Sequence, residues 1–368
     1  MATPSDFPAA PGRIRVGIIG CGLIAINHVK AARGVTAAEV VAVADIDLAR
    51  AEAFAQTHEV PLAYGDIDTM LGDGILDAVM VCTPHPAHEA NVLAAARHGV
   101  HVMCEKPIAL TLESADRMIQ ACDEAGVTFG AIYQRRLWPA SQQIRAALDD
   151  GSLGRPISAQ LTARFSRDAE YYSEPWRGRW DTEGGGVLVT QTSHHIDLLQ
   201  WLMDSDVTRV TARYATLAHG DFIEVDDTVV ALLEFASGAL ATVHLATTFN
   251  PALGVQLWVT DARGHTAGLR EFPEGVGFAD EWTVPGSETF ANPYAEGAYN
   301  VPLSEIHRTL TPFHTLQIAD FIEALLTGRD PVVTGREARR SLAIITAIYA
   351  SSRSGQAVEL ASSSASDN

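Results

Sequence analysis

Short apolar runs alternate with longer amphipathic stretches over the first third of the chain. The runs are rich in β-branched residues, and the alanine-rich stretches between them repeat apolar side chains at helical spacing. Such alternation is typical of β-α-β units, which build a parallel sheet. We therefore predict a doubly wound α/β domain over residues 13–134. Its expected strands are 14–19, 40–44, 78–82, 100–104 and 127–132.

The pattern changes after the turn-rich residues 151–156. Longer alternating runs follow, and two of them, 228–235 and 239–247, are joined by Ala-Ser-Gly, a hairpin with glycine where the backbone is left-handed. We predict an α+β domain over residues 135–361 with a large, mainly antiparallel sheet and one long helix through Trp201. Two late helices, near 314–326 and 336–351, are able to pack back on the first domain. Residues 1–12 and 362–368 are expected to be disordered tails.

Composition narrows the class of protein. The 368 residues are 47% hydrophobic and 19% charged, which is enough apolar surface for folded cores. With 26 Lys and Arg against 45 Asp and Glu, the formal charge is −19, so nucleic acid is an unfavourable partner. No apolar run approaches the ~20 residues of a membrane span, and the opening residues do not resemble a signal peptide. We expect a cytoplasmic protein with no membrane partner.

The four cysteines lie far apart in the sequence. They form no Cys-x-x-Cys pair and no Cys/His cluster at zinc spacing. Three of them fall in or beside the predicted strands, where cysteine commonly serves as a small hydrophobic residue. We expect buried, reduced thiols and no metal site.

The first predicted strand runs directly into Gly-Cys-Gly-Leu-Ile-Ala at residues 20–25. Gly20 allows a tight turn, Gly22 lets a pyrophosphate approach the backbone, and the following helix offers free N–H groups to the phosphates. Asp45 follows Gly22 by 45 − 22 = 23 residues, at the end of the second strand, where a carboxylate can bind a ribose. Together they predict a dinucleotide site of the Rossmann type, the alternative being a turn that serves packing alone.

Polar residues also follow the later strands, at the sheet edge where open α/β folds bind ligands. Lys106 comes directly after an apolar strand and before Pro107, which favours a rigid position facing the cofactor over an exposed loop lysine. The predicted cofactor-binding residues are Gly20, Gly22, Leu23, Ile24, Asp45, Thr83, Pro84, His88, Glu105, Lys106 and Gln134.

A glycine triplet at 184–186 precedes a second group of polar residues. On one helix, Thr190, His194 and Asp197 would share a face, whereas His195 would lie about 100° round the axis with Gln191. A histidine on an apolar helix is more often a hydrogen-bonded core residue than a catalyst, so this pattern alone does not decide the role of His194.

With these motifs in hand, the chain resembles the Gfo/Idh/MocA oxidoreductases over roughly residues 14–360. The markers are the glycine turn, Thr83-Pro84, Glu105-Lys106-Pro107, and the triplet with His194-His195-Ile196-Asp197. The resemblance implies a nicotinamide cofactor on the first domain, a sugar or polyol substrate between that domain and the C-terminal sheet, and a homodimer or homotetramer built by that sheet. It also implies that Lys106 and His194 are catalytic.

One position departs from the family pattern. Many sugar and polyol members carry Asp four residues before the motif histidine, where this chain has Thr190. We therefore expect proton transfer to fall to Lys106, to His194 or to both, with Thr190 and Asp197 setting the position or tautomer of His194. The predicted substrate-binding residues are Lys106, Arg135, Tyr172, Trp176, Arg177, Thr190, Gln191 and His194, although the aromatic ones could instead pack between domains.

The sequence thus predicts an NAD(H)-dependent enzyme that moves a hydride between nicotinamide and a secondary alcohol. NADP is disfavoured because Asp45 would repel its 2′-phosphate, and the nearest cation, Arg50, lies a helical turn away. Two alternatives stay open. One is an NAD-dependent glycosidase that uses transient oxidation and elimination, and the other is a cofactor-binding regulator without turnover.

Overall fold

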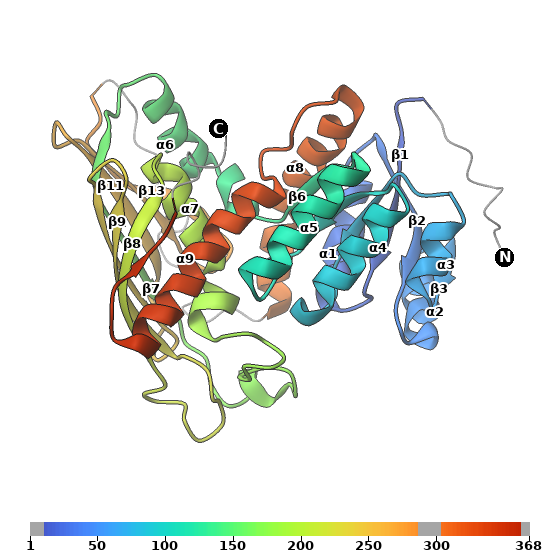
Figure 1. The fold of residues 1–368 in the computed structure, drawn as a ribbon, viewed down its shortest axis with the longest axis horizontal. Helices are drawn as coiled ribbons and strands as arrows, with labels where there is room; N and C mark the ends of the chain where they lie inside the picture. Colours follow the sequence, from blue (N-terminus) through green and yellow to red (C-terminus); the bar gives the residue numbers. More distant parts are fainter. Residues whose placement is uncertain (1–10, 286–302, 362–368) are drawn as a thin grey trace. The chain divides into compact units, whose positions relative to one another are not determined.

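The computed structural model describes residues 11–285 and 303–361, so the expected tails lie almost wholly outside the described residues. The chain forms two compact units (Figure 1). The first comprises Met1–Gln134 and His307–Arg339, and the second comprises Arg135–Ile306 and Arg340–Asn368. Within the described ranges, no helix combines the length and apolar character that crossing a membrane requires.

The first unit is built on a six-stranded parallel sheet with the order β3-β2-β1-β4-β5-β6. Its strands are β1 Ile14–Ile19, β2 Ala38–Ala44, β3 Leu62–Tyr64, β4 Ala78–Val81, β5 His101–Cys104 and β6 Phe129–Ala131. Its helices are α1 Leu23–Arg33, α2 Leu48–Thr57, α3 Ile67–Gly72, α4 His88–Arg97 and α5 Leu112–Ala125, with α8 Leu303–Thr327 belonging to it from His307 onward. The doubly wound fold is confirmed, and β3 and α3 are additions that the apolar pattern did not predict.

Helix α8 and the residues after it complete the edge of this sheet. The Gln317 side chain donates to the Ala131 carbonyl at 2.7 Å and accepts the Tyr133 N–H at 3.0 Å. Ala131 also donates to the carbonyl of Val333 at 3.0 Å. Chain from far along the sequence therefore satisfies backbone groups of β6 that an edge strand would leave exposed.

The second unit contains an eight-stranded, mostly antiparallel sheet with the order β13-β12-β11-β7-β10-β9-β8-β14, in which β7 and β10 run parallel. Its strands are β7 Pro156–Arg164, β8 Val207–Ala215, β9 Thr228–Phe235, β10 Leu240–Ala246, β11 Gly254–Asp261, β12 Thr266–Glu271, β13 Gly277–Trp282 and β14 Val358–Glu359. Two helices, α6 Pro139–Asp149 and α7 Ser193–Met203, belong to this unit, and α9 Gly335–Ser354 passes into it from the first. The predicted α+β class is confirmed.

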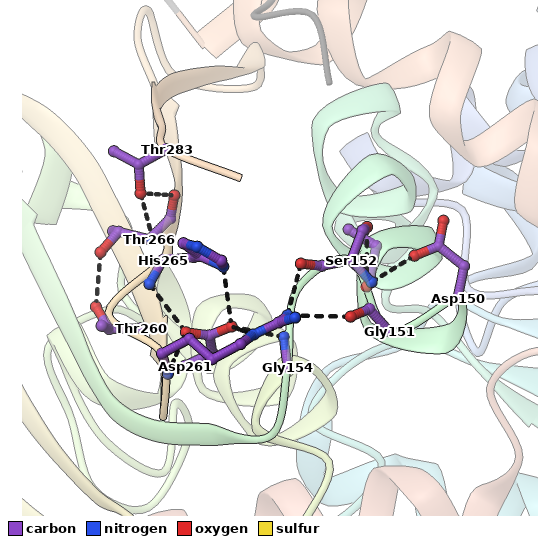
Figure 2. Close-up of polar contacts among 11 residues, drawn as sticks. Asp150, Gly151, Ser152, Gly154, Thr260, Asp261, His265, Thr266 and Thr283 are labelled. Atoms are coloured by element: carbon purple, nitrogen blue, oxygen red, sulfur yellow. Dashed lines mark hydrogen bonds and ion pairs between the residues drawn. The ribbon is translucent and has the colours of Figure 1, made fainter. Parts of the chain in front are cut away.

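Asp261, at the end of β11, clamps two loops of this unit together (Figure 2). Its fully buried carboxylate accepts backbone N–H groups from Gly154 at 2.7 Å, Arg263 at 2.8 Å and His265 at 2.9 Å. Arg263 in turn donates to the Ser152 carbonyl at 2.7 Å. Burial alone would raise the pKa of Asp261, but these hydrogen bonds outweigh it and hold that pKa well below its usual range.

The long helix expected after the glycine triplet is wrong in its first part. Val187–Gln191 is a π-helical turn, and α7 begins only at Ser193. The cause is Asp226, whose carboxylate accepts the N–H groups of Gly186 at 2.8 Å and Leu188 at 3.0 Å. A Cβ on Gly186 would collide with the Asp226 backbone, so only glycine permits this approach. The shared α-helical face of Thr190, His194 and Asp197 therefore does not exist as predicted.

Candidate functional site

The turn between β1 and α1 has the shape needed to receive a pyrophosphate. Gly20 has φ +93°, a conformation that favours glycine, and Gly22 lies directly before α1. A Cβ added at Gly22 would meet no atom within 4 Å, and no side chain caps the start of α1. Open space beside free helix N–H groups fits the phosphates of a dinucleotide. The adjacent Leu23 is largely exposed.

Asp45 lies beside this turn, as predicted from the spacing. Its Oδ2 accepts the Cys21 N–H at 2.9 Å, and its Oδ1 accepts the Asp47 N–H at 3.0 Å. The Arg50 guanidinium lies 3.7 Å from Asp45 Oδ1, so a cation is closer to the expected ribose position than the sequence suggested. Burial, followed by the charge of Asp45, raises the pKa of the Cys21 thiol to about 12, which keeps it unreactive.

The loop after β4 packs against the same turn. A Cβ on Gly20 would come within 2.9 Å of Thr83, so these two segments already touch. Asn91 donates to the Thr83 hydroxyl at 3.0 Å and fixes its orientation. His88, expected to bind cofactor, is fully buried, and its ring nitrogens face the carbonyls of Thr83 at 2.9 Å and Pro107 at 3.0 Å. It therefore links the loops after β4 and β5 from inside the unit.

Glu105 and Lys106 directly follow β5, and Lys106 is partly exposed while Glu105 is buried. Glu105 Oε1 lies 2.8 Å from His28 Nε2 and 3.9 Å from His314 Nε2. One ligand atom from each of these three residues lies within 4.8 Å of the other two, a spacing compatible with a bound metal ion, whereas the sequence led us to expect no metal site. Sequence reasoning missed both histidines; the available signal was a polar residue, His28, on the otherwise apolar face of α1.

In the second unit, Thr190 lies on the π-helical turn and His194 on the first turn of α7. Thr190 donates its hydroxyl proton to Glu183 Oε1 at 2.6 Å, and the Gly178 N–H donates to Oε2 at 2.6 Å. Glu183 is almost fully buried, and burial raises its pKa. A carboxylate is thus present beside Thr190 after all, supplied by a residue that the motif comparison missed.

Two expected site residues are engaged in buried ion pairs. Arg136 donates to both oxygens of Asp197 at 2.7 Å, and Ser341 adds a third hydrogen bond at 2.9 Å. Asp197 therefore neutralises a guanidinium, a role not predicted for it. Arg135 donates to Glu271 at 2.7 Å and 3.2 Å, and the same carboxylate contacts His195. With its guanidinium held in the interior, we withdraw Arg135 as a substrate ligand.

The aromatic segment before the glycine triplet divides into two parts. Tyr172 is buried in a small apolar cluster with Ile223 and Val225. Tyr171, its neighbour, accepts a hydrogen bond from Gln191 at 2.9 Å and another from Arg177. Arg177 lies over the rings of Tyr171 at 4.2 Å and Trp176 at 4.5 Å. The structure thus brings Trp176, Arg177 and Gln191 together around Tyr171, whereas Tyr172 turns to the core.

Models of one protein family match two successive parts of the chain. The NAD-binding Rossmann-fold model of the Gfo/Idh/MocA oxidoreductase family matches residues 14–133, and the family's C-terminal domain model matches residues 141–265. The chain is 31% identical to 1,5-anhydro-D-fructose reductase of Ensifer adhaerens, over 94% of this chain and 98% of that one. It is also 31% identical to D-apiose dehydrogenase of Paraburkholderia graminis, over 95% and 90% of the two chains.

Among solved structures, the WlbA dehydrogenase of Bordetella pertussis, in complex with NADH and UDP-GlcNAcA, superposes with a TM-score of 0.79. It is 31% identical, and the match covers 95% of this chain and 99% of that one. The resemblance read from the motifs is thereby confirmed. The chain belongs to the Gfo/Idh/MocA oxidoreductase family, and its first unit carries the family's NAD-binding Rossmann fold.

Proposed function

We propose that this protein is an NAD(H)-dependent dehydrogenase or reductase acting on a secondary alcohol or ketone of a sugar, sugar derivative or polyol. The observation that carries the proposal is that the glycine turn, Thr83 and Lys106 follow the carboxyl ends of the adjacent parallel strands β1, β4 and β5. Ligands of open α/β sheets bind at that edge. The named activities of the relatives, a reductase of anhydrofructose and a dehydrogenase of apiose, support a carbohydrate substrate.

Each group at this edge has a defined task. The N-terminus of α1 with Gly20 and Gly22 would hold the pyrophosphate, and Asp45 would accept hydrogen bonds from the adenosine ribose. The bound dinucleotide supplies the hydride chemistry. Lys106 would hydrogen-bond the reacting oxygen and hold its proton at Nζ, a task that requires an amine able to lose its charge.

The second unit would orient the substrate. His194 would hydrogen-bond a neighbouring hydroxyl and share its proton. The group around Tyr171 offers aromatic faces and a guanidinium, which suit a sugar ring and its polar substituents. Thr190, held by Glu183, would present its hydroxyl oxygen to the same substrate.

The decisive experiment is an absorbance assay at 340 nm with NAD(H) and NADP(H) against sugars, cyclitols, nucleotide-linked sugars and their keto forms. We expect turnover with at least one carbohydrate, and a loss of about 10²- to 10⁴-fold in kcat for Lys106→Ala with cofactor binding nearly unchanged. Free sugar released without net NADH would identify the glycosidase instead. Tight NADH binding with no turnover across the panel would identify the regulator.

We further propose that the protein forms a homodimer or homotetramer through the outer face of the C-terminal sheet. Val230, Leu232 and Leu240 are apolar side chains on β9 and β10 that remain between 38% and 52% exposed. These three side chains lie on an exposed strip that also carries Glu234, Thr242 and His244, their partners across the two strands. Such a mixture of apolar and polar groups is common at interfaces between subunits. The four buried, unpaired thiols support a reducing location, and we propose the cytoplasm.

A further inference from the structure

The segment that follows β5 is surrounded by buried histidines from three different helices. His28 lies on α1, His88 begins α4 and His314 lies on α8, and none is more than 1% exposed. Interior histidines require partners for their ring nitrogens. For all three, a partner lies on the short segment Glu105, Lys106 and Pro107.

The carboxylate of Glu105 joins two of these helices to the backbone of Lys106. Its Oε1 accepts from His28 Nε2 at 2.8 Å and faces His314 Nε2 at 3.9 Å. Its Oε2 accepts the backbone N–H of Lys106 at 3.2 Å. His314 is itself anchored, because its Nδ1 lies 3.0 Å from the Leu310 carbonyl, which can only accept. The Glu105 carboxylate therefore connects α1 and α8 to the backbone at Lys106.

His88 holds the other side of the same segment. Its Nδ1 lies 3.0 Å from the Pro107 carbonyl, and its Nε2 lies 2.9 Å from the Thr83 carbonyl. A neutral imidazole has one N–H and can donate to only one of these oxygens, whereas a protonated ring can donate to both. The ring thus links the residue after Lys106 to the loop that packs against Gly20.

We propose that His28, His88 and His314 are positioning residues for Lys106, holding the segment through the Glu105 carboxylate on one side and the Pro107 carbonyl on the other. The inference rests on the proposed function, in which Lys106 carries the proton. None of the three histidines touches the reacting atoms. Their effect is on where the lysine backbone lies and on the charge beside it.

Glu105 places a carboxylate against the backbone N–H of Lys106. Burial alone would raise the pKa of Glu105, but the hydrogen bond from His28, together with the nearby ring of His314, holds it well below its usual range. Burial lowers the pKa values of His28 and His88, so neutral rings are favoured there. Among the residues that the structure describes, Glu105 also acts on the His88 ring and on the thiols of Cys82 and Cys104, whose pKa values burial raises well above their usual range. The segment therefore carries a negative charge next to the lysine.

A buried carboxylate is weakly screened and favours the ammonium form of a nearby amine. Glu105→Gln keeps the shape and removes the charge. We expect the acid limb of the kcat profile for alcohol oxidation, which requires the neutral amine, to move at least about 0.5 pH unit lower in this variant. His28→Gln, His88→Gln and His314→Gln should each lower kcat by about 10- to 100-fold, with the KM for NAD within about threefold.

The matched control is His101→Gln, at the opposite end of the same strand. His101 Nδ1 accepts the Thr128 N–H at 2.9 Å, so its loss disturbs β5 without touching Glu105. We expect both kcat and its pH profile to stay at the wild-type values. NADH binding, followed by fluorescence, and thermal unfolding identify any variant that fails to fold. If Glu105→Gln is such a variant, the three histidine variants test the proposal alone.

A second measurement does not depend on turnover. The amine of Lys106 is acylated with a limiting reagent across a pH series in the full chain, and its modification is followed by peptide mass spectrometry. The midpoint should move to lower pH in Glu105→Gln and stay constant in His101→Gln. A shifted midpoint in a protein that turns over no carbohydrate would contradict the proposed function and leave the positioning intact.

Three results would overturn the inference. The first is an unchanged acid limb and labelling midpoint in folded Glu105→Gln. The second is a loss of kcat in the histidine variants that merely follows a loss of NADH binding. The third is one equivalent of zinc or iron in the purified protein that disappears in His28→Gln, since the cluster would then be a metal site.

Discussion

At the scale of single residues, Asp45 and its neighbour Arg50 have opposite effects on the binding of NADP. Its carboxylate repels a 2′-phosphate, but Arg50, 3.7 Å away, could receive one. We expect Asp45→Ala to lower kcat/KM for NAD by about 10- to 100-fold, the value of one or two charged hydrogen bonds. The kcat/KM for NADP should rise, since the repulsion is gone and Arg50 is released. Steady-state kinetics with both cofactors measures the ratio.

The control for this prediction is Asp45→Ala combined with Arg50→Ala. If Arg50 is the cation that accepts the phosphate, the double variant should lose the gain with NADP while the rate with NAD stays low. A wild-type protein that already prefers NADP would show that Asp45 does not govern the choice.

The two adjacent histidines should respond differently to replacement. His195 is fully buried against Glu271, and burial lowers its pKa, so His195→Ala removes a hydrogen-bond donor from a buried carboxylate that Arg135 still neutralises. We expect this variant to lose about 1–3 kcal/mol of stability in urea unfolding. His194→Ala should lower kcat with a much smaller loss of stability. Equal stability losses for the two variants would contradict this division.

Sequence reasoning at this scale predicted the position of a residue where that residue directly follows a strand. Asp45 lies beside the glycine turn as expected, because the end of a buried strand is visible in the apolar pattern. His28 and Glu183 were missed for different reasons. The partner of His28 is 77 residues away, and the partner of Glu183 lies across a turn whose shape depends on Asp226. Contacts of this kind cannot be read from the spacing of apolar and polar residues along the sequence.

At the scale of elements, the π-helical turn places Thr190 in contact with Glu183 and so determines the effect of a substitution at this position. An aspartate at this position would meet Glu183, which already accepts from the threonine hydroxyl at 2.6 Å. We expect Thr190→Asp to destabilise the protein by about 1–3 kcal/mol at pH 7, because a carboxylate in contact with the buried Glu183 makes ionisation of both groups unfavourable. Adding Glu183→Gln should restore the stability.

The loss of stability caused by Thr190→Asp should increase with pH. The pKa of Glu183 is already raised by burial, and a second carboxylate raises it further. A carboxyl whose folded pKa is raised contributes stability at low pH and loses it as pH rises through that value. The penalty of Thr190→Asp should therefore grow between about pH 4 and pH 8. A penalty independent of pH in urea unfolding would rule out the shared-proton explanation.

The contribution of the Asp261 clamp to stability should depend on pH in the opposite direction and be lost in acid (Figure 2). Asp261→Asn would place an amide opposite backbone N–H donors, and we expect a loss of about 1–3 kcal/mol at pH 7. Because the folded pKa of Asp261 is depressed, its contribution is present above about pH 4 and is lost as pH falls through the folded value. The difference between wild type and variant in thermal unfolding should therefore shrink in acid.

At the scale of the whole molecule, the exposed strip on β9 and β10 predicts an oligomer. Leu232→Glu would place a charge in the centre of this strip and should convert the assembly to monomer, as light scattering would show. Leu217→Glu is the matched control, because Leu217 is 72% exposed and lies outside both strands. A wild-type protein that is monomeric at all concentrations would refute the proposed interface.

Much of the architecture could be predicted because most of the strands and helices have their own apolar period. The hairpin of β9 and β10 and the unit built on β1, β2, β4, β5 and β6 follow directly from it. The three-residue strand β3 is too short to show a period. That α8 completes the first unit was left open, since the pairing of Gln317 with Ala131 depends on residues 186 apart.

That discontinuity has a consequence for how the protein is made. The chain passes between the units after Gln134, after Ile306 and after Arg339, so neither unit is one uninterrupted stretch. When residue 134 has left the ribosome, every strand of the parallel sheet has been synthesised. Gln317 and Val333, which bond to the edge strand β6, have not. The edge strand of the nascent nucleotide-binding unit therefore keeps unpaired backbone groups until almost the entire chain has been translated. Chaperone occupancy should be greatest during that interval.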